Sequence, residues 1–308
     1  MTIDIGLHTG PQEIAMEELK RLWKRADETG FHWISVWDHF YANPFRDRSE
    51  PCFEAVASMA ALAALTKNVQ VGCLMFCALY RHPSVLAKAA VTIDHISNGR
   101  VNLGVGAGWL KEEFEDFGYE FPPIGVRFEH LEEVLQIIRA LFQEAEVNFK
   151  GRYYQVSRAV CSPKPVQKRL PIWVGGRGPE RTPQTAARFA DGFNIPYIAA
   201  DEYRKRLDVV DRTCDEIGRD PATIKRTVNL GFYMGADAKS AERNREKAKR
   251  HDASMQGGLL VGTADQVIAR MESFVKAGAR GINIATRPPV DWDAVEAFIE
   301  QVLPHFHK

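Results

Sequence analysis

The sequence lacks the features that mark membrane and nucleic-acid proteins. None of its 308 residues belongs to a run of about 18 apolar residues that could cross a bilayer, and no basic segment leads into an apolar stretch at the start. Lysine plus arginine and aspartate plus glutamate both number 40, so the positive charge typical of nucleic-acid binders is missing. We therefore expect a cytoplasmic protein that binds neither membrane nor nucleic acid.

Metal-ligand and disulfide spacings are also missing. The five cysteines are odd in number and scattered, with no Cys-x-x-Cys pair. A metal-dependent barrel hydrolase, one alternative for a chain of this type, would want paired histidines on its first strand, and His8-Thr9-Gly10 does not supply them. The sequence predicts reduced thiols and no metal.

What the sequence does contain is a repeated alternation of strand and helix patterns. Apolar, β-rich runs predict eight strands at residues 3–8, 34–37, 69–76, 101–105, 172–174, 192–195, 227–234 and 281–285. Each run is followed by a helical pattern or by a connection long enough to hold one, which favours a parallel sheet. We predict an α/β protein with a single (β/α)8 TIM barrel over residues 1–308.

Three insertions interrupt this repeat, near residues 109–126, 147–170 and 235–262. Residues 147–160 carry Lys150-Gly151-Arg152 at a tip followed by Tyr153 and Tyr154, which predicts a β-hairpin. We expect this hairpin on or near the rim formed by the carboxyl ends of the strands, and extra helices elsewhere. The charged run 241–250 is typical of a solvated helix face.

The second predicted strand ends in Trp37-Asp38-His39-Phe40, which places two titratable groups where active sites lie in parallel barrels. His39 is the candidate proton carrier, because an imidazole titrates near neutral pH. His8, at the end of the first strand, is a second candidate proton carrier, or else a residue that lines the pocket. The alternative is structural, with Asp38 capping a loop and His39 packed beneath it.

Two glycine-rich segments follow the fourth and fifth predicted strands. They are Gly106-Ala107-Gly108 and Gly175-Gly176-Arg177-Gly178. Glycines let backbone N–H groups approach a ligand, and a helix start just beyond favours an anion, so the pair indicates a phosphate site. Arg177 and Arg181 would add positive charge there. Each segment can also be a plain tight turn.

Several motifs, in order along nearly the whole chain, resemble those of the luciferase-like superfamily, and within it the branch that uses the deazaflavin coenzyme F420. They are Gly6-Leu7-His8-Thr9-Gly10, Trp37-Asp38-His39-Phe40, Tyr80-Arg81-His82-Pro83, Leu86-Ala87-Lys88, residues 94–100, Gly104-Val105-Gly106-Ala107-Gly108-Trp109, Pro163-Lys164-Pro165 and Trp173-Val174-Gly175-Gly176. Together they identify the superfamily more sharply than they identify a substrate.

The resemblance implies a hydride transfer between coenzyme F420 and a small organic substrate, in a homodimer. The ring would lie across the strand ends, with its phosphate on backbone amides and with a non-prolyl cis peptide behind it, here Leu74–Met75. His39 would be the proton partner and Asp38 would orient the imidazole or bind the ring. The implied cofactor-binding residues are Asp38, Leu74, Met75, Gly106, Ala107, Gly108, Gly175, Gly176 and Arg177.

One departure and two alternatives bear on this resemblance. The F420-dependent sugar-phosphate dehydrogenases carry a proton-donating glutamate where this chain has Trp109, which argues against glucose-6-phosphate chemistry and for a more apolar pocket lined by Trp109 and His8. Glu112 and Glu113 are expected to be solvated. The alternatives are an FMN-dependent monooxygenase supplied by a partner reductase, and a non-catalytic flavin- or deazaflavin-binding protein.

Overall fold

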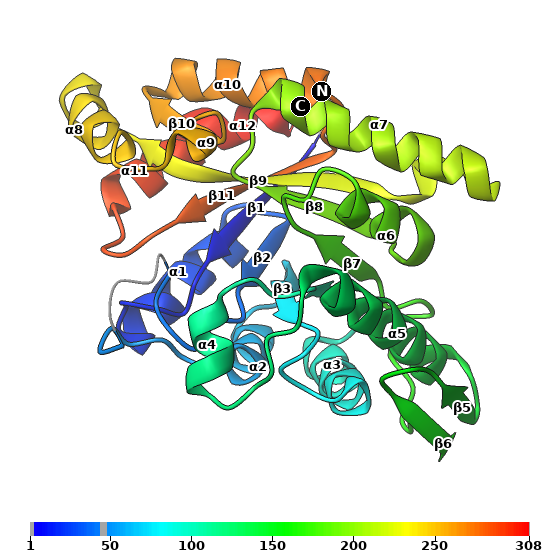
Figure 1. Cartoon of the computed structure of the whole chain (residues 1–308). Coiled ribbons are helices and arrows are strands. Elements are labelled where there is room, and N and C mark those ends of the chain that lie inside the picture. The colour runs from blue at the N-terminus through cyan, green and yellow to red at the C-terminus, as the bar shows by residue number, and fades with distance from the viewer. Residues whose placement is uncertain (1–2, 44–47, 308) are drawn as a thin grey trace.

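The computed structural model describes residues 3–43 and 48–307. Its main sheet is a closed parallel barrel, in which neighbouring strands follow the order β1, β2, β3, β4, β7, β8, β9, β11 and back to β1 (Figure 1). These are the eight predicted strands, so the predicted TIM barrel is confirmed. The strands are β1 (Asp4–Thr9), β2 (Trp33–Val36), β3 (Gln70–Cys77), β4 (Val101–Gly106), β7 (Ile172–Gly175), β8 (Gly192–Pro196), β9 (Lys225–Met234) and β11 (Gly281–Thr286).

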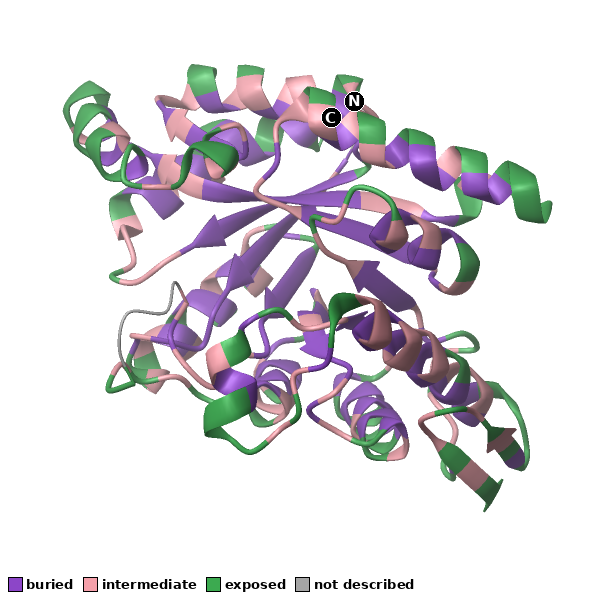
Figure 2. Ribbon diagram, in the orientation of Figure 1, coloured by how far each residue is buried: buried purple, intermediate pink, exposed green. Residues whose placement is uncertain are grey.

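Helices cover the outside of the barrel, and Figure 2 shows their buried faces turned toward the strands. The helices are α1 (Met16–Glu28), α2 (Ala55–Leu65), α3 (Pro83–Ser97), α4 (Lys111–Asp116), α5 (Ile124–Gln143), α6 (Arg181–Phe189), α7 (Ala200–Ile217), η1 (Pro221–Thr223), α8 (Ala238–Ala248), α9 (Ala253–Gln256), α10 (Ala264–Lys276), α11 (Trp292–Ala297), η2 (Phe298–Val302) and α12 (Leu303–Phe306). Within the described residues, no helix combines the length and apolarity needed to cross a membrane.

Tryptophan side chains fill the barrel interior at its amino end, and small residues of β9 and β11 leave space at its carboxyl end. Trp33 and Trp173, near the starts of their strands, pack with ring centroids 4.7 Å apart. Above them lies a polar layer, in which Asn194 and Asn283 both donate side-chain hydrogen bonds to Asn229. The next inward positions on β9 and β11 hold Gly231 and Ala285, whose small size leaves room for a ligand at the carboxyl rim.

The predicted hairpin exists but lies mostly away from the rim. Its strands β5 (Val147–Lys150) and β6 (Gln155–Ala159) pair antiparallel and project beyond α5, at the lower right of Figure 1. Backbone N–H groups at its tip, those of Arg152, Tyr153 and Tyr154, donate to the Glu133 carboxylate on α5. Only Tyr154 approaches the rim, with its ring 5.7 Å from that of His82 at the start of α3.

The short elements that were not predicted include a strand and a helix near the ends of the barrel strands. Strand β10 (Leu259–Gly262) pairs with the last four residues of β9, inside the segment taken as an insertion. Helix α4 occupies the segment after Trp109 that was expected to be a solvated acidic loop. The second difference matters for the site, because α4 brings a carboxylate into the rim.

Candidate functional site

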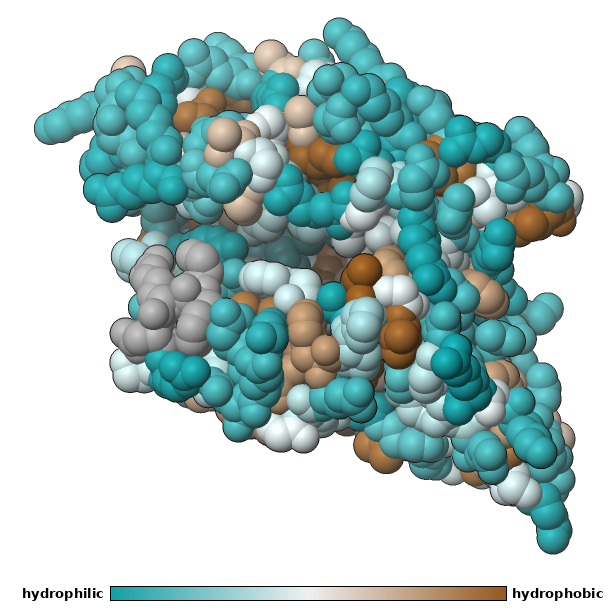
Figure 3. Space-filling model, in the orientation of Figure 1, coloured by the Kyte–Doolittle hydropathy of each residue, from teal (hydrophilic) through white to brown (hydrophobic). Residues whose placement is uncertain are grey.

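The carboxyl rim gathers side chains from strands far apart in the sequence. In Figure 1 the arrowheads of β1 and β11 lie above α4, and Figure 3 shows a hollow across the middle of this face of the molecule. The predicted residues His8, Asp38 and His39 and the glycine segments after β4 and β7 all stand at this rim. Parallel barrels place their chemistry at this end.

Asp38 is buried, and its carboxylate bonds to the end of β3 and to the loop that follows it. It accepts hydrogen bonds from both terminal nitrogens of Arg81, at 2.7 and 2.8 Å, and from the Cys77 backbone N–H at 2.9 Å. Burial raises the pKa of Asp38, and Arg81 opposes that rise. Burial alone would lower the pKa of Arg81, but the hydrogen bonds and negative charges of Asp38 and Glu54 together outweigh burial and raise it. The pair is therefore an ion pair that fixes the end of β2 to the end of β3.

Glu113 orients the imidazole of His39, which is the role that the sequence analysis gave to Asp38. The His39 Nδ1 atom lies 2.9 and 3.1 Å from the two carboxylate oxygens of Glu113. The same carboxylate accepts from the backbone N–H groups of Phe40 and Tyr41, at 2.7 and 3.0 Å, and from the Tyr80 hydroxyl at 2.9 Å. Glu113 is completely buried, so the expectation that it would be solvated is wrong.

This arrangement selects one tautomer of His39. Burial raises the pKa of Glu113, but the hydrogen bonds from His39, Tyr41 and Tyr80 outweigh it and lower the pKa, so the carboxylate is ionised. An ionised carboxylate can only accept hydrogen bonds, and Nδ1 must therefore carry the proton. The Nε2 atom of His39 has no hydrogen-bond partner among the described residues.

The signal for Glu113 was present in the sequence but weak. Leu110 and Phe114 are both buried, and Glu113 lies three residues after the first and next to the second, so all three share the inner face of α4. A carboxylate on a buried helix face needs several donors. Those donors lie 72 to 74 residues earlier at His39, Phe40 and Tyr41, and 33 residues earlier at Tyr80, where sequence spacing gave no indication of them.

Trp109 lies over His39 at the open side of the rim. The two rings meet edge to face, with centroids 5.5 Å apart, and Trp109 is 58% exposed although the His39 side chain is only 12% exposed. Few contacts hold an indole in that position, so it is available to cover a bound ring or substrate. The predicted placement of Trp109 beside the pocket is compatible with this geometry.

The glycines of the rim make room for Met75, which the sequence analysis did not foresee. A Cβ on Gly175 would lie 2.2 Å from the Met75 Cε, and one on Gly104 would lie 2.6 Å from its Sδ. Gly106 is nearly as close, at 3.2 Å from the Met75 Cβ. The Leu74–Met75 peptide is cis and sits where β3 shifts its register against β4, as the resemblance implied.

We expect Gly175→Ala to destabilise the protein by about 2 kcal/mol, because the added methyl group overlaps Met75 and lies 2.8 Å from the Asn194 carbonyl oxygen. Urea unfolding would measure this. Gly125→Ala is the matched control, since its Cβ would have no neighbour nearer than 3.8 Å. Equal unfolding midpoints for the two variants would show that Met75 can move aside.

The second halves of the glycine segments pack against Cys77 and Phe114, at Gly108, and against Thr182 of helix α6, at Gly176 and Gly178. Gly108 has a left-handed φ of +75°, and a Cβ there would meet the Cys77 Sγ at 2.7 Å, so only glycine fits. Gly176 has a φ of +149° and precedes the start of α6. Arg177 is exposed and donates to the Ser254 carbonyl at 2.8 Å, which ties it to α9.

His8 is an uncharged side chain that lines the rim. Its Nδ1 lies 2.9 Å from the Ser35 hydroxyl, and its ring lies 5.1 Å from that of Trp37. Burial, with the nearby charges of Arg287 and His39, lowers the pKa of His8 to about 3. His8 therefore lines the pocket as an uncharged group rather than carrying a proton at neutral pH.

The family follows from comparison of the whole chain with known proteins. The family model described as luciferase-like monooxygenase matches residues 1–251. The chain belongs to the luciferase-like monooxygenase family. A curated relative is the F420-dependent glucose-6-phosphate dehydrogenase of Amycolatopsis mediterranei (strain U-32), which is 28% identical over 98% of both chains.

Solved structures of this luciferase-like fold match over nearly the whole chain. An F420-dependent secondary alcohol dehydrogenase in complex with an F420-acetone adduct superposes with a TM-score of 0.87 and 22% identity, covering 100% of both chains. A long-chain alkane monooxygenase superposes with a TM-score of 0.83 and 17% identity, covering 99% of this chain and 91% of the other. At these identities the two structures establish the fold alone.

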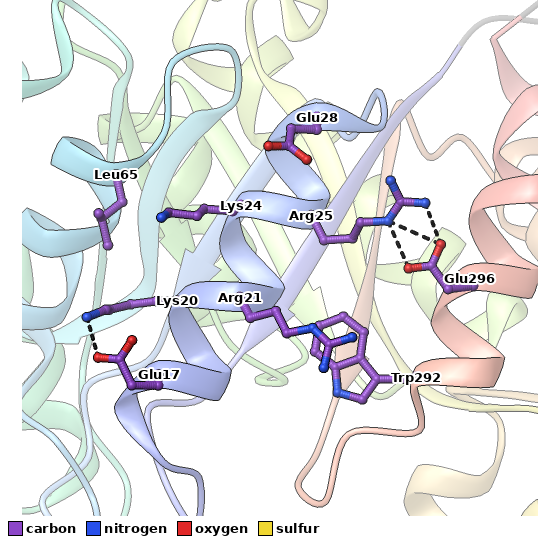
Figure 4. A pocket seen from close by; sticks show the side chains of 9 residues that line it. All are labelled: Glu17, Lys20, Arg21, Lys24, Arg25, Glu28, Leu65, Trp292 and Glu296. Carbon is purple, nitrogen blue, oxygen red and sulfur yellow. Dashed lines mark hydrogen bonds and ion pairs between the residues drawn. The ribbon is translucent and has the colours of Figure 1, made fainter.

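Other surface features of this luciferase-like protein do not compete with the rim. The described residues contain no group of three or more histidine, cysteine, aspartate or glutamate side chains placed to hold a metal. A cavity of about 420 Å³ lies outside the barrel beside α1 (Figure 4). Its charges are largely satisfied internally, since Arg25 pairs with Glu296 and Lys20 with Glu17.

Proposed function

We propose that this protein is an oxidoreductase that transfers a hydride between coenzyme F420 and a small organic substrate. The observation that carries the proposal is the His39 imidazole, whose Nδ1 is held by the buried Glu113 while its other nitrogen remains for proton exchange. The curated relative named above uses F420, and so does the alcohol dehydrogenase with the same fold. A hydride transfer to or from an alcohol or carbonyl carbon needs such a proton partner.

The residues of the rim fit the cofactor that we propose. When bound, a deazaflavin supplies a ring carbon that accepts or donates a hydride. Met75 and the Leu74–Met75 peptide would form the wall behind the ring, and the backbone after β4 and β7 would hold the phosphate at Gly106, Ala107, Gly108, Gly175 and Gly176. Trp109 would help to exclude water. His39 Nε2 would take or give the proton of the substrate oxygen.

Asp38 has a supporting part in this proposal. Its bidentate contact with Arg81 leaves it unable to orient His39, but it fixes the strand ends on which the ring would rest. Arg177 would add positive charge near the phosphate. Glucose 6-phosphate is not the substrate that we propose, because Trp109 occupies the position of the dehydrogenases' glutamate.

A two-component FMN monooxygenase, with a partner reductase, is the second candidate. It is favoured by the family assignment and by the likeness to the long-chain alkane monooxygenase. Equilibrium titration separates the two candidates, with F420 and FMN each followed by its own fluorescence. We expect F420 to bind at least 10-fold more tightly than FMN. Tighter binding of FMN, with oxygen uptake on adding reduced FMN, would favour the monooxygenase.

We further propose a homodimer, in the cytoplasm, joined through α2 and α3. The eleven residues of α2 include no charged side chain, and Ala57 and Ala64 are exposed on it. On the adjacent α3, Val85 is 60% exposed and Ile96 is 45% exposed. A surface helix normally turns a polar face to water, so this apolar face fits a second copy of the chain. The five described cysteines are all unpaired, which suits a reducing compartment.

The double variant Val85→Glu, Ile96→Glu is expected to be monomeric, because two carboxylates would be buried without partners in the interface. Light scattering after size exclusion should give the mass of one chain, 34.7 kDa. Val160→Glu is the control, because Val160 is also 60% exposed but lies next to the hairpin. A double variant that keeps the wild-type mass would place the interface elsewhere.

A further inference from the structure

Arg287 follows β11 directly and reaches the rim beside His8. Along β11 alternate side chains enter the barrel, and Asn283, which donates to Asn229, marks the inward set to which residue 287 belongs. The register pairs Ala285 with Gly231 of β9, so Arg287 stands level with Tyr233. The guanidinium therefore faces the mouth of the barrel from the side opposite the glycine segments.

Aromatic rings and neutral oxygens surround this guanidinium. Its Cζ lies 5.4 Å from the Trp37 ring and 6.0 Å from the Tyr197 ring. One terminal nitrogen donates to the Asn43 carbonyl, and the other lies 3.4 Å from the Tyr197 hydroxyl. Across residues 3–43 and 48–307, no carboxylate comes within ion-pair distance of Arg287. Several of its five N–H donors are left for a ligand.

Several other partly buried arginines of this protein have their donors satisfied, either by carboxylates or, for Arg100, by several backbone carbonyl oxygens. Arg81 pairs with Asp38 at 2.7 Å, Arg139 pairs with Asp191, and Arg226 pairs with Asp211. Within the described part of the chain, Arg287 has neither a counter-ion nor a full set of acceptors, which favours a ligand at the rim that supplies both.

The groups facing Arg287 from the neighbouring elements are neutral at pH 7. Burial and then the charge of Arg287 lower the pKa of His251, whose Nε2 contacts the Tyr233 hydroxyl. Burial raises the pKa of Tyr233, against the effect of Arg287. His8 is neutral as well, because its pKa is about 3. Arg287 is thus the charge that an anionic ligand would meet on this side of the mouth.

We propose that Arg287 recognises a carboxylate on the substrate, so that the enzyme acts on small carboxylic acids. The inference rests on the proposed function. Trp37 connects the two ends of the pocket, since its ring is 5.1 Å from His8 and 5.4 Å from the Arg287 Cζ, and His39 follows it by two residues. A carboxylate on Arg287 would leave the rest of a planar or apolar molecule between Trp37, Tyr197 and Trp109, with its reacting carbon toward His39.

A carboxylate suits this site better than a phosphate. A guanidinium fork matches the two oxygens of a carboxylate, and a single cation balances its single charge. The carboxylate undergoes no bond change, because the hydride passes at another carbon and the proton passes at His39. The alternative source of the anion is the cofactor's own acidic tail, and the experiment must separate the two.

The test compares cinnamate with cinnamamide, which differ in charge but little in shape, on protein loaded with oxidised F420. Isothermal titration should give at least 10-fold tighter binding of cinnamate to the wild type. Arg287→Met should reduce that ratio to less than 2-fold, and Arg287→Lys should keep part of it. Arg188→Met, an exposed arginine at the end of α6, should leave the ratio unchanged.

Several results would overturn the inference. Equal binding of the two probes to F420-loaded wild type, binding of neither probe, or an unchanged ratio in Arg287→Met would each do so. A second titration uses a deazaflavin that lacks the acidic tail of F420. If Arg287→Met greatly weakens the binding of F420 but not of this shortened cofactor, Arg287 would be assigned to the cofactor tail instead. Failure of the wild type to bind F420 would overturn the proposed function itself, so the two failures are distinguishable.

Discussion

Glu113→Ala is expected to lower turnover by at least about 100-fold and to destabilise the protein by about 3 kcal/mol. The variant would leave the N–H groups of Phe40 and Tyr41 and the Tyr80 hydroxyl buried without their acceptor. It would also release His39 from the tautomer that keeps Nε2 available. Steady-state kinetics and urea unfolding measure the two effects.

The matched control for this variant is Glu115→Ala on the same helix, since Glu115 is exposed and forms an i,i+4 ion pair with Lys111 on the surface. The stability difference should also depend on pH. The folded pKa of Glu113 is lowered, so its stabilisation is present above the unfolded value of about 4.3 and is lost as pH falls through the folded value. A loss of stability equal to that of Glu115→Ala would contradict the role of Glu113.

His39→Ala should depress the rate of hydride transfer by about 100- to 10,000-fold while changing the F420 dissociation constant by less than about 3-fold. The reason is that the proposed phosphate contacts belong to other strands, after β4 and β7. Stopped-flow absorbance of F420 measures the rate, and fluorescence titration measures the affinity. His95→Ala is the control, because His95 is exposed on α3. An unchanged rate would remove His39 from the mechanism.

Most of the fold could be predicted because its strands are apolar runs punctuated by glycine, proline and helical patterns. Strand β10 escaped prediction because it has only four residues and gains its place by pairing with the end of the long β9. The hairpin was recognised from its turn residues. The position of the hairpin could not be predicted, because it depends on three backbone N–H groups that donate to Glu133 on α5.

The residues of the site could be predicted, but the hydrogen bonds between their side chains could not. The sequence located His39 and the glycine segments, because strand ends and glycine runs are local patterns. It assigned Asp38 to the imidazole, and the structure instead pairs Asp38 with Arg81 and His39 with Glu113. Both pairings join residues more than 40 positions apart, where the burial of a carboxylate depends on donors that only the folded chain brings together.

Nuclear magnetic resonance of the histidine side chains tests the central claim most directly, because it needs no substrate. In protein labelled with ¹⁵N at histidine, adding F420 should shift the His39 imidazole signals and leave those of the exposed His95 and His305 unchanged. The spectrum of His39→Gln would assign the signal. We expect a saturable His39 shift that follows F420 binding. F420 binding that leaves the His39 signals in place would contradict the account.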